Sequence, residues 1–503
     1  MTEELKKNLD CVKKTLEEAE KYVHAARVIN FDLETICPSK GMEKQGEVAA
    51  FLSNKAFALQ KDESFIESAK FVYEHRAELS DPLDKVWAET WARDYRLEKN
   101  ITSDMQLEFA KIYNKSYIDW LNAKKENNFA LFAPSLKAVR DVEMKRISLI
   151  DGALKNSYDN LLDMYERGMT SEDLDKAFGE CTSRLVPLLK KIQNSKKKIR
   201  TDFLSREVTD EQQKKMAQYL LEVMGYDFSR GAFTTTEHPF TDGLAKDDAR
   251  VTTHYYPTMF ASSMFSIIHE GGHALFEQLQ PEADHEHYIT QNKTMGMHES
   301  VSRFYENRIG RSEAFIHLIY PKVCEIFPQV MSDVSEKELY EAMNIVTPSL
   351  IRTEADEFTY TFHIIIRYEL EKLIVNGGAK IDDLRDLWNK KYSEYLGVTP
   401  QKDSEGILQD VHWSSGFGYF PTYAIGNMYN AMYYKKMSES FNIDEAVRAG
   451  DFAKINEWMK ENVFKKADTL SPKDWLKDIT GKTFSPDSFL DYLEEKYSKL
   501  YEL

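Results

Sequence analysis

Cysteine is scarce in this sequence, and its few residues are far apart. The four cysteines among 503 residues are Cys11, Cys37, Cys181 and Cys324, and no two of them form a C-x-x-C pair. A thiolate metal site and a disulfide framework are therefore not expected.

Proline and glycine are also few, with 14 and 21 residues in the whole chain. Because these residues punctuate turns, their scarcity favours long helices over many strands. The sequence has no apolar run of about 18 residues and no apolar signal core near its first residue. We therefore expect no membrane span, and the cytosol as the location of the protein.

Basic residues do not predominate, since the formal net charge is −17 and the acidic residues are spread along the chain. This balance argues against a nucleic-acid partner. Hydrophobic residues make up 42% of the chain and aromatic residues 12%, which is ample for a large core. No Pro/Gly/Ser-rich linker divides the sequence, so we expect one domain over residues 1–503.

The N-terminal residues have the apolar spacing of a long helix. Apolar side chains recur there at alternating intervals of four and three residues, at Leu5, Leu9, Val12, Leu16, Ala19, Val23 and Ala26. This pattern predicts a helix that packs on other helices. Helical periodicity returns in residues 86–96, 105–126 and 136–165, and Pro472 and Pro486 introduce two further predicted helices.

Residues 231–257 differ in composition from the rest of the chain. They contain two β-branched and aromatic runs, 233–236 and 251–256, separated by a polar loop that includes glycine. These runs predict a small antiparallel pair of strands. The pair either holds an extended peptide along its edge by main-chain hydrogen bonds or is a purely structural hairpin.

An H-E-x-x-H motif stands in an apolar stretch that favours a buried helix. Residues four apart share a helix face, so His269 and His273 can both direct an imidazole at one ion, and Zn²⁺ suits such ligands. Glu270 would lie beside the ion, where its carboxylate can take a proton from a water that the metal activates. Gly271 and Gly272 each cost a helix about 0.8–1.0 kcal/mol relative to alanine, which indicates that another segment approaches closely. The motif predicts a metalloprotease.

Two histidines leave a zinc site incomplete, so a third protein ligand is needed downstream. The best candidate is Glu299, which is followed by Arg303 and Glu306 at helical spacing and so lies on a second predicted helix. His285 and His287 are competitors in an acidic loop. A mobile surface loop is a poor place for a rigid ligand, so we favour Glu299.

The chain resembles metallocarboxypeptidases of the carboxypeptidase Taq family over nearly its whole length. The resemblance rests on a set of short blocks that occur in the family's order, and it is their combination that makes it specific. The blocks are His238-Pro239-Phe240, Asp248-Ala249-Arg250-Val251-Thr252, the H-E-x-x-H motif, His298-Glu299-Ser300, Ile351-Arg352-Thr353-Glu354-Ala355-Asp356, and Gly406-Ile407-Leu408-Gln409-Asp410-Val411-His412-Trp413 continuing into Gly418-Tyr419-Phe420-Pro421-Thr422-Tyr423. Val301 and Phe31 depart from the pattern, which usually has Gln and Trp there, and this puts only local packing or subsite detail in doubt.

The resemblance implies a mostly helical, zincin-like fold with a small antiparallel sheet beside a deep groove. It implies a homodimer that removes single residues from peptide C-termini, using one Zn²⁺ or Co²⁺ per chain. His269, His273 and Glu299 are the implied metal ligands, and Glu270 is the implied catalytic carboxylate. On this interpretation, roughly residues 1–200 form a helical part that covers the groove, and roughly 201–503 carry the metal site.

A carboxypeptidase must also hold the free carboxylate of its substrate. Arginine does this best, because its planar fork donates two charge-assisted hydrogen bonds. Arg352 and Arg250 are the candidates. The alternative for each is a structural ion pair, between Arg352 and Asp356 or between Arg250 and Asp248.

The oxyanion formed during peptide hydrolysis needs a donor besides the metal. His412 and Tyr423 stand in an aromatic segment punctuated by glycine that can wrap over a groove, and they are our candidates. Tyr419 is a weaker alternative, because tyrosines in such a segment are more often part of a core.

Three other functions are compatible with parts of the sequence. A zinc aminopeptidase would carry a G-x-M-E-N segment upstream of the motif, and none is present. A zinc oligoendopeptidase would not need the carboxylate clamp. An inactive, metal-free helical scaffold would have no need of Glu270 beside both histidines.

Overall fold

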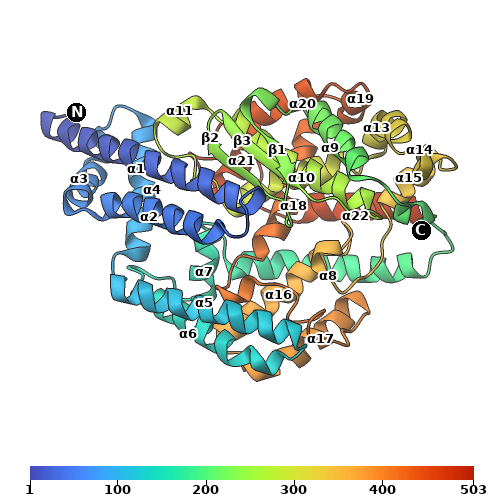
Figure 1. Ribbon diagram of the computed structural model, residues 1–503, viewed down its shortest axis with the longest axis horizontal. Coiled ribbons are helices and arrows are strands. Elements are labelled where there is room, and N and C mark those ends of the chain that lie inside the picture. Colours follow the sequence, from blue (N-terminus) through green and yellow to red (C-terminus); the bar gives the residue numbers. More distant parts are fainter.

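Helices dominate the computed structural model, which describes residues 1–503 (Figure 1). This confirms the mostly α fold. The helices of the first half are α1 (Glu3–Thr35), α2 (Met42–Lys61), α3 (Glu63–Glu74), α4 (Pro82–Glu98), α5 (Ser103–Lys125), α6 (Ala133–Leu149), α7 (Ser157–Tyr165), α8 (Ser171–Gln193) and α9 (Asp210–Met224). Those of the second half are α10 (Phe260–Leu279), α11 (Glu282–Glu286), α12 (Met295–Arg303), α13 (Glu313–Ile326), α14 (Pro328–Met331), α15 (Glu336–Met343), α16 (Tyr360–Val375), α17 (Leu384–Leu396), α18 (Pro421–Ser438), α19 (Ile443–Arg448), α20 (Phe452–Met459), α21 (Pro472–Thr480) and α22 (Asp487–Tyr501).

The long N-terminal helix is present as predicted, and α1 buries Leu5, Leu9, Val12 and other residues of the apolar stripe. The helical stretch at 136–165, by contrast, is two helices, α6 and α7. Gly152 lies between them with φ of 71°, a left-handed conformation that a right-handed helix does not contain. None of the helices has the length and apolar character needed to cross a bilayer.

The single sheet has three strands, β1 (Phe233–Thr235), β2 (Thr241–Ala245) and β3 (Asp248–Thr253), in the order β1-β3-β2. The small sheet is confirmed, but the predicted antiparallel pairing of its first and last runs is wrong. β1 pairs with β3 in parallel, and the antiparallel partner of β3 is β2, which the sequence suggested was a loop. A tight connection at residues 246–247 makes β2 and β3 a hairpin, so β1 takes the other edge of β3 and runs in the same direction.

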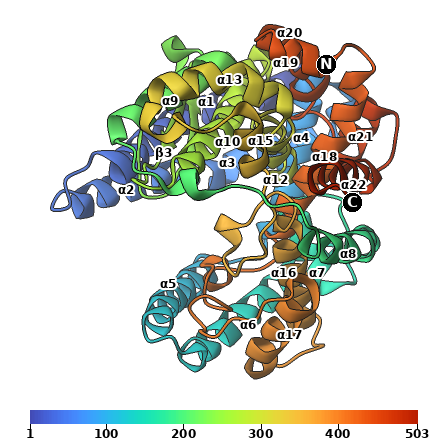
Figure 2. The ribbon, with the colours of Figure 1, turned by 90° about the vertical axis from the view of Figure 1, so that its right-hand side faces the viewer.

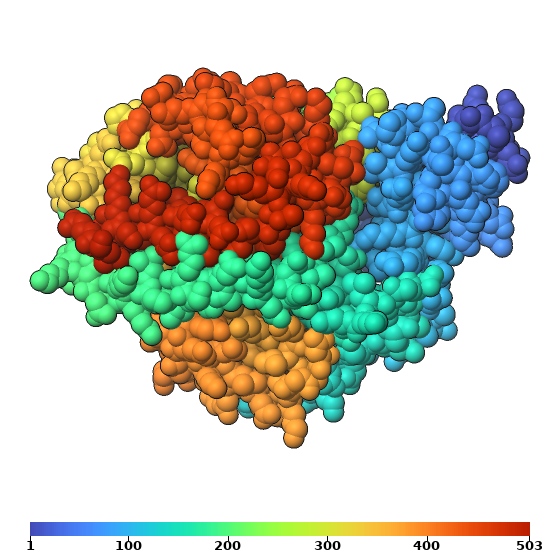
Figure 3. All heavy atoms as spheres, turned by 180° about the vertical axis from the view of Figure 1, so that it is seen from behind, coloured from blue at the N-terminus to red at the C-terminus, as the bar shows by residue number.

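Two hydrophobic cores hold the molecule together. The larger extends from Trp120 to Tyr501, and the smaller consists of buried residues of α1, α3 and α4 together with Leu79 and Ile289. Figure 2 shows α5, α6 and α17 on one side of the molecule and α1–α4 with α9, α10, α13 and α15 on the other. Seen from behind, the first helices form a lobe at one end, while α8 lies along the C-terminal helices (Figure 3).

Helix α10, which carries the H-E-x-x-H motif, occupies the centre of this arrangement. It packs against α9 on one side, against β2 and β3 on another, and against α12. Helix α12 in turn lies against α18. These contacts bring the motif, the sheet, α12 and α18 together.

Candidate active site

The two glycines of the motif are sites of close helix packing. A Cβ atom on Gly271 would lie 2.9 Å from Leu221 Cδ2 of α9, and one on Gly272 would lie 2.8 Å from the Cα atom of Ser302 in α12. This confirms the close approach that the glycines predicted. It is also the reason why α12 can place Glu299 next to the histidines of α10.

The structure brings the three predicted ligands together. One ligand atom from each of His269, His273 and Glu299 lies within 4.8 Å of the others. Glu299 Oε2 is 3.7 Å from His269 Nε2 and 3.6 Å from His273 Nε2. All three side chains are largely buried, and two imidazoles with one carboxylate are a donor set that suits Zn²⁺ and similar ions. The residues therefore fit a divalent metal.

Each histidine is held by a partner on its other ring nitrogen. His269 Nδ1 is 2.8 Å from Glu306 Oε2, in the π-helical turn Phe304–Ile309 that follows α12. His273 Nδ1 is 2.6 Å from His298 Nδ1, and His298 Nε2 is 2.8 Å from Glu277 Oε1. Since a carboxylate only accepts, His298 donates from Nε2 and can accept from His273 at Nδ1. Both Nε2 atoms of the motif are thus left to bind an ion.

Charged neighbours keep the third ligand ionised. Burial acts to raise the pKa of the Glu299 carboxyl, but His269 and Arg303 outweigh this effect and hold that pKa well below its usual range. Arg303 Nε lies 2.8 Å from Glu299 Oε1 and fixes its orientation. For His298, a base, burial acts in the opposite direction and lowers the pKa to about 4, so this ring is neutral at pH 7. An ionised carboxylate is the form of Glu299 that metal binding requires.

The carboxylate of Glu270 is positioned by the sheet. Thr241 of β2 places its hydroxyl oxygen 2.8 Å from Glu270 Oε2 and 2.8 Å from the Glu270 carbonyl oxygen. Glu270 is buried, with 8% of it exposed, and the Thr241 hydroxyl is the hydrogen-bond partner of its carboxylate. The strand edge therefore orients the predicted catalytic carboxylate.

The two candidate oxyanion donors, His412 and Tyr423, lie next to each other. The Tyr423 hydroxyl is 3.5 Å from His412 Nε2, and both residues line a cavity of about 220 Å³ together with Tyr165 and Tyr419. Burial raises the pKa of Tyr423 well above its usual value, and the charge of Glu299 contributes to the shift. Tyr423 lies on α18, which packs against the helix of Glu299, and Tyr419, whose ring centroid is 5.3 Å from that of Tyr423, lies beside it.

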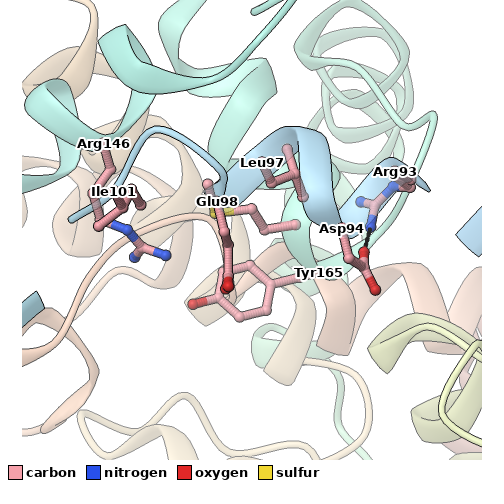
Figure 4. Close-up of a pocket in the computed structure, with 8 residues that line it drawn as sticks. Arg93, Asp94, Leu97, Glu98, Ile101, Arg146 and Tyr165 are labelled. Atoms are coloured by element: carbon pink, nitrogen blue, oxygen red, sulfur yellow. Dashed lines mark hydrogen bonds and ion pairs between the residues drawn. The ribbon is translucent and has the colours of Figure 1, made fainter. Parts of the chain in front are cut away.

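A second cavity of about 270 Å³ adjoins this one at Tyr165. Figure 4 shows Arg146 at one end and the ion pair of Arg93 and Asp94 at the other, with the Tyr165 ring between them. The two cavities share Tyr165.

Arg352 is buried in a cluster of charges. Its Nε and one amino nitrogen lie 2.9 Å from Asp410 Oδ1, and the other amino nitrogen is 3.0 Å from the Tyr360 hydroxyl. Arg367 binds the second oxygen of Asp410 at 2.5 Å. The pairing of Arg352 with Asp356, which the sequence left open, does not occur, because Asp356 instead caps the amides of Thr347 and Thr359.

Arg250 makes the ion pair with Asp248 that the sequence offered as its alternative role. Its Nε and one amino nitrogen lie 2.8 and 2.7 Å from the two oxygens of Asp248. The guanidinium also lies over the Phe31 ring, 5.0 Å from the centroid. His285 and His287, the competing ligands, are not in the metal cluster, and His287 contacts Asp81 and Asp84 instead.

Several contacting residues were not found from the sequence. Thr241 lay in a stretch that suggested a loop, so nothing indicated its position. Glu306 was noticed only for its spacing, and His298 only for its place beside Glu299. Asp410 belongs to one of the blocks shared with the family, but its pairing with Arg352 spans 58 residues and has no local signal.

Comparison with known proteins gives consistent matches over the whole chain. Residues 11–497 match the family described as carboxypeptidase Taq (M32) metallopeptidase. Carboxypeptidase 1 of Bacillus subtilis is 39% identical over 484 residues, or 96% of each chain, and thermostable carboxypeptidase 1 of Thermus thermophilus is 34% identical over 94% of each. A solved M32 carboxypeptidase from Deinococcus radiodurans R1 has a TM-score of 0.94 at 30% identity, covering 99% of this chain and 100% of that one. A Pyrococcus furiosus carboxypeptidase structure has a TM-score of 0.92 at 32% identity, covering 99% of each.

Proposed function

This chain belongs to the carboxypeptidase Taq (M32) metallopeptidase family and is a metallocarboxypeptidase, and from this premise we propose how its residues act. His269, His273 and Glu299 hold one divalent ion, Zn²⁺ or Co²⁺. The observation that carries the assignment is the convergence of these side chains, with the Glu270 carboxylate on the same helix. When bound, such an ion supplies a Lewis acid and lowers the pKa of a coordinated water.

Glu270 is the general base in this proposal. Its carboxylate takes a proton from the attacking water and returns it to the leaving amine. The Thr241 hydroxyl holds the carboxylate in place during both transfers, since it contacts Oε2 at 2.8 Å. Orientation of this kind matters because proton transfer requires heavy atoms at hydrogen-bond distance.

His412 and Tyr423 donate hydrogen bonds to the oxyanion that develops on the substrate carbonyl. Burial lowers the pKa of His412 to about 4, so the ring is neutral at pH 7 and acts as a donor without a charge. Because burial raises the pKa of Tyr423, its hydroxyl keeps its proton and can donate.

Arg352 binds the terminal carboxylate of the peptide. Two guanidinium groups, Arg352 and Arg367, share the single carboxylate of Asp410, so these three groups together carry a net positive charge. Both amino nitrogens of Arg352 carry a second N–H besides those that face Asp410 and Tyr360. This cationic, partly satisfied fork is suited to a substrate carboxylate, and it restricts cleavage to the last peptide bond. Arg250, whose fork faces Asp248, is the weaker candidate.

We further propose that the chain is one peptidase domain over residues 1–503, with roughly residues 1–200 covering the groove and roughly 201–503 carrying the metal site. It acts in the cytosol as a homodimer on peptides with a free C-terminus, and it removes single residues. It has no nucleic-acid partner, in keeping with its net charge of −17.

The Glu270→Gln substitution tests the mechanism. Turnover of a blocked dipeptide should be abolished, while metal content measured by elemental analysis stays near that of the wild type. His269→Ala is the matched control, because it should lose the metal as well as the activity. If Glu270→Gln released its metal as completely as His269→Ala, the role assigned to Glu270 would be wrong.

A further inference from the structure

The segment between α10 and α12 contacts the N-terminal helices away from the catalytic centre. Ile289 is buried in the small core formed by α1, α3 and α4, and Tyr288 packs against the same core. Just before them, His287 follows α11 and lies against the first turn of α4. The two halves of the molecule therefore meet at His287.

Two carboxylates from the start of α4 face the ring of His287. Asp81 Oδ2 is 3.1 Å from His287 Nε2, and Asp84 Oδ1 is 3.7 Å from it. The three atoms lie within 4.8 Å of one another, as the three catalytic ligand atoms do. The side chains of Asp84 and His287 are 8% and 13% exposed and that of Asp81 is 43% exposed, so the cluster opens to solvent on the Asp81 side.

The other ring nitrogen determines what His287 can do. Its Nδ1 is 2.8 Å from the Ala283 carbonyl oxygen, and because a carbonyl only accepts, Nδ1 carries a proton. A neutral ring then directs the lone pair of Nε2 at two carboxylates, an arrangement that is stable only with a positive charge between them. That charge is either a second proton on the ring or a cation. A histidine with Nδ1–H on a backbone carbonyl and Nε2 facing carboxylates is the form that binds metals in proteins.

Two further charged groups bear on the cluster. Asp284, three residues before His287, is 2% exposed, and its Oδ2 atom has no hydrogen-bond donor. Burial and the nearby Asp468 raise the pKa of Asp284 to about 7, while Lys293 and His287 oppose this shift. Lys13 of α1 lies 2.7 Å from Asp84 Oδ1, and its side chain is 40% exposed, so it can swing into solvent. With a neutral His287 ring, the two carboxylates of Asp81 and Asp84 outnumber the one lysine that contacts them.

We propose that Asp81, Asp84 and His287 form a second site for a divalent cation of the Zn²⁺ type, separate from the catalytic one. One nitrogen and two carboxylate oxygens are a donor set that Zn²⁺ accepts. The ion competes with Lys13 for Asp84. Two of its ligands come from the start of α4 and the third from the segment between α10 and α12. The ion therefore links the N-terminal helices to the part of the enzyme that carries the catalytic site.

The metal content of the holoenzyme tests this site. After loading with Zn²⁺ and desalting, the wild type should retain about two ions per chain, and Asp84→Asn and Asp81→Asn about one each, because binding requires the charged ligands. Asp81 caps the first turn of α4 through the Leu83 amide, and asparagine caps equally well, so the fold is kept. Asp62→Asn is the matched control: Asp62 caps α3 in the same way but has no histidine beside it, so two ions should remain.

Lys13→Met distinguishes a cation site from a set of ion pairs. If Lys13 and Zn²⁺ compete for Asp84, removal of the ammonium should tighten Zn²⁺ binding at this site severalfold and increase the rise in Tm on adding Zn²⁺. An ion-pair network predicts the reverse, a lower Tm and no added Zn²⁺ binding. A wild type that retains only the catalytic ion, or an Asp84→Asn variant that retains as much Zn²⁺ as the wild type, would overturn the proposal. Neither result would affect the catalytic assignment, because Glu270→Gln is read out by turnover.

Discussion

Thr241→Val should slow the enzyme without removing its metal. The Thr241 hydroxyl has one proton and lies 2.8 Å from both the Glu270 carboxylate and the Glu270 backbone carbonyl. Valine has nearly the same shape and suits a β-strand, so β2 should keep its place beside α10. The substitution therefore removes one polar contact of the base and little else.

The size of the effect follows from the charge of the acceptor. A hydrogen bond to a charged group contributes about 1.5–3 kcal/mol, more than a neutral one. If the bond serves only to orient Glu270 for proton transfer, its loss appears in kcat, and this energy corresponds to about 10- to 150-fold slower turnover. KM and metal content should stay close to those of the wild type, because Thr241 contacts no metal ligand.

The measurement is kcat and KM on a blocked dipeptide, with metal content and Tm determined on the same preparations. Thr253→Val is the control, because Thr253 lies in the neighbouring strand and its buried hydroxyl has no hydrogen-bond partner. It should turn over like the wild type. A Thr241→Val enzyme with wild-type kcat, or one that slows only as it loses metal, would refute the positioning role.

The other predictions concern the metal, the substrate and pH. Glu299→Ala should lose the catalytic ion, because two histidines cannot complete the site, and His285→Ala should retain it. Elemental analysis measures this, and metal loss in His285→Ala but not in Glu299→Ala would contradict the ligand set. Arg352→Ala should lower kcat/KM by the equivalent of about 2–5 kcal/mol on peptides with a free C-terminus, but should change it little on amidated peptides. Arg250→Ala should affect both kinds of peptide alike. Equal losses on both for Arg352→Ala would disprove the clamp. Burial lowers the pKa of His412 to about 4, so the ring is neutral in the folded protein above that pH. In the unfolded chain its pKa is about 6.5, so below pH 6.5 unfolding lets His412 take up a proton. Stability is therefore lost as the pH falls from about 6.5 towards 4. Urea unfolding of the wild type should show about 2 kcal/mol of this loss between pH 7 and pH 5, and His412→Phe should lack it; identical pH dependence in both proteins would contradict the assignment.

Local features of the fold could be read from the sequence. The helix of the motif, the stripe of α1 and the helices that begin near Pro472 and Pro486 depend on spacing and capping over a few residues, and they are present in the structure. The strand pairing was wrong, because the hairpin of β2 and β3 rests on a tight connection within a polar stretch that has little β propensity. Direction and partner in a sheet depend on which segments meet in space, and a run of β-formers does not specify that.

The sequence by itself determined that His269 and His273 face one point, because residues four apart on a helix converge whatever surrounds them. It also identified Glu299, His412, Tyr423 and Arg352 as candidates, through motifs that occur in a set order. Only the tertiary structure decided what holds them: Glu306 and His298 on the rings, and Asp410 on the arginine. These partners come from other turns or from segments far along the chain, and the close packing of α10, α12 and β2 brings them within hydrogen-bond distance. The identity of the site residues was therefore readable from local sequence, while the orientation of their side chains depends on how the helices and the sheet pack.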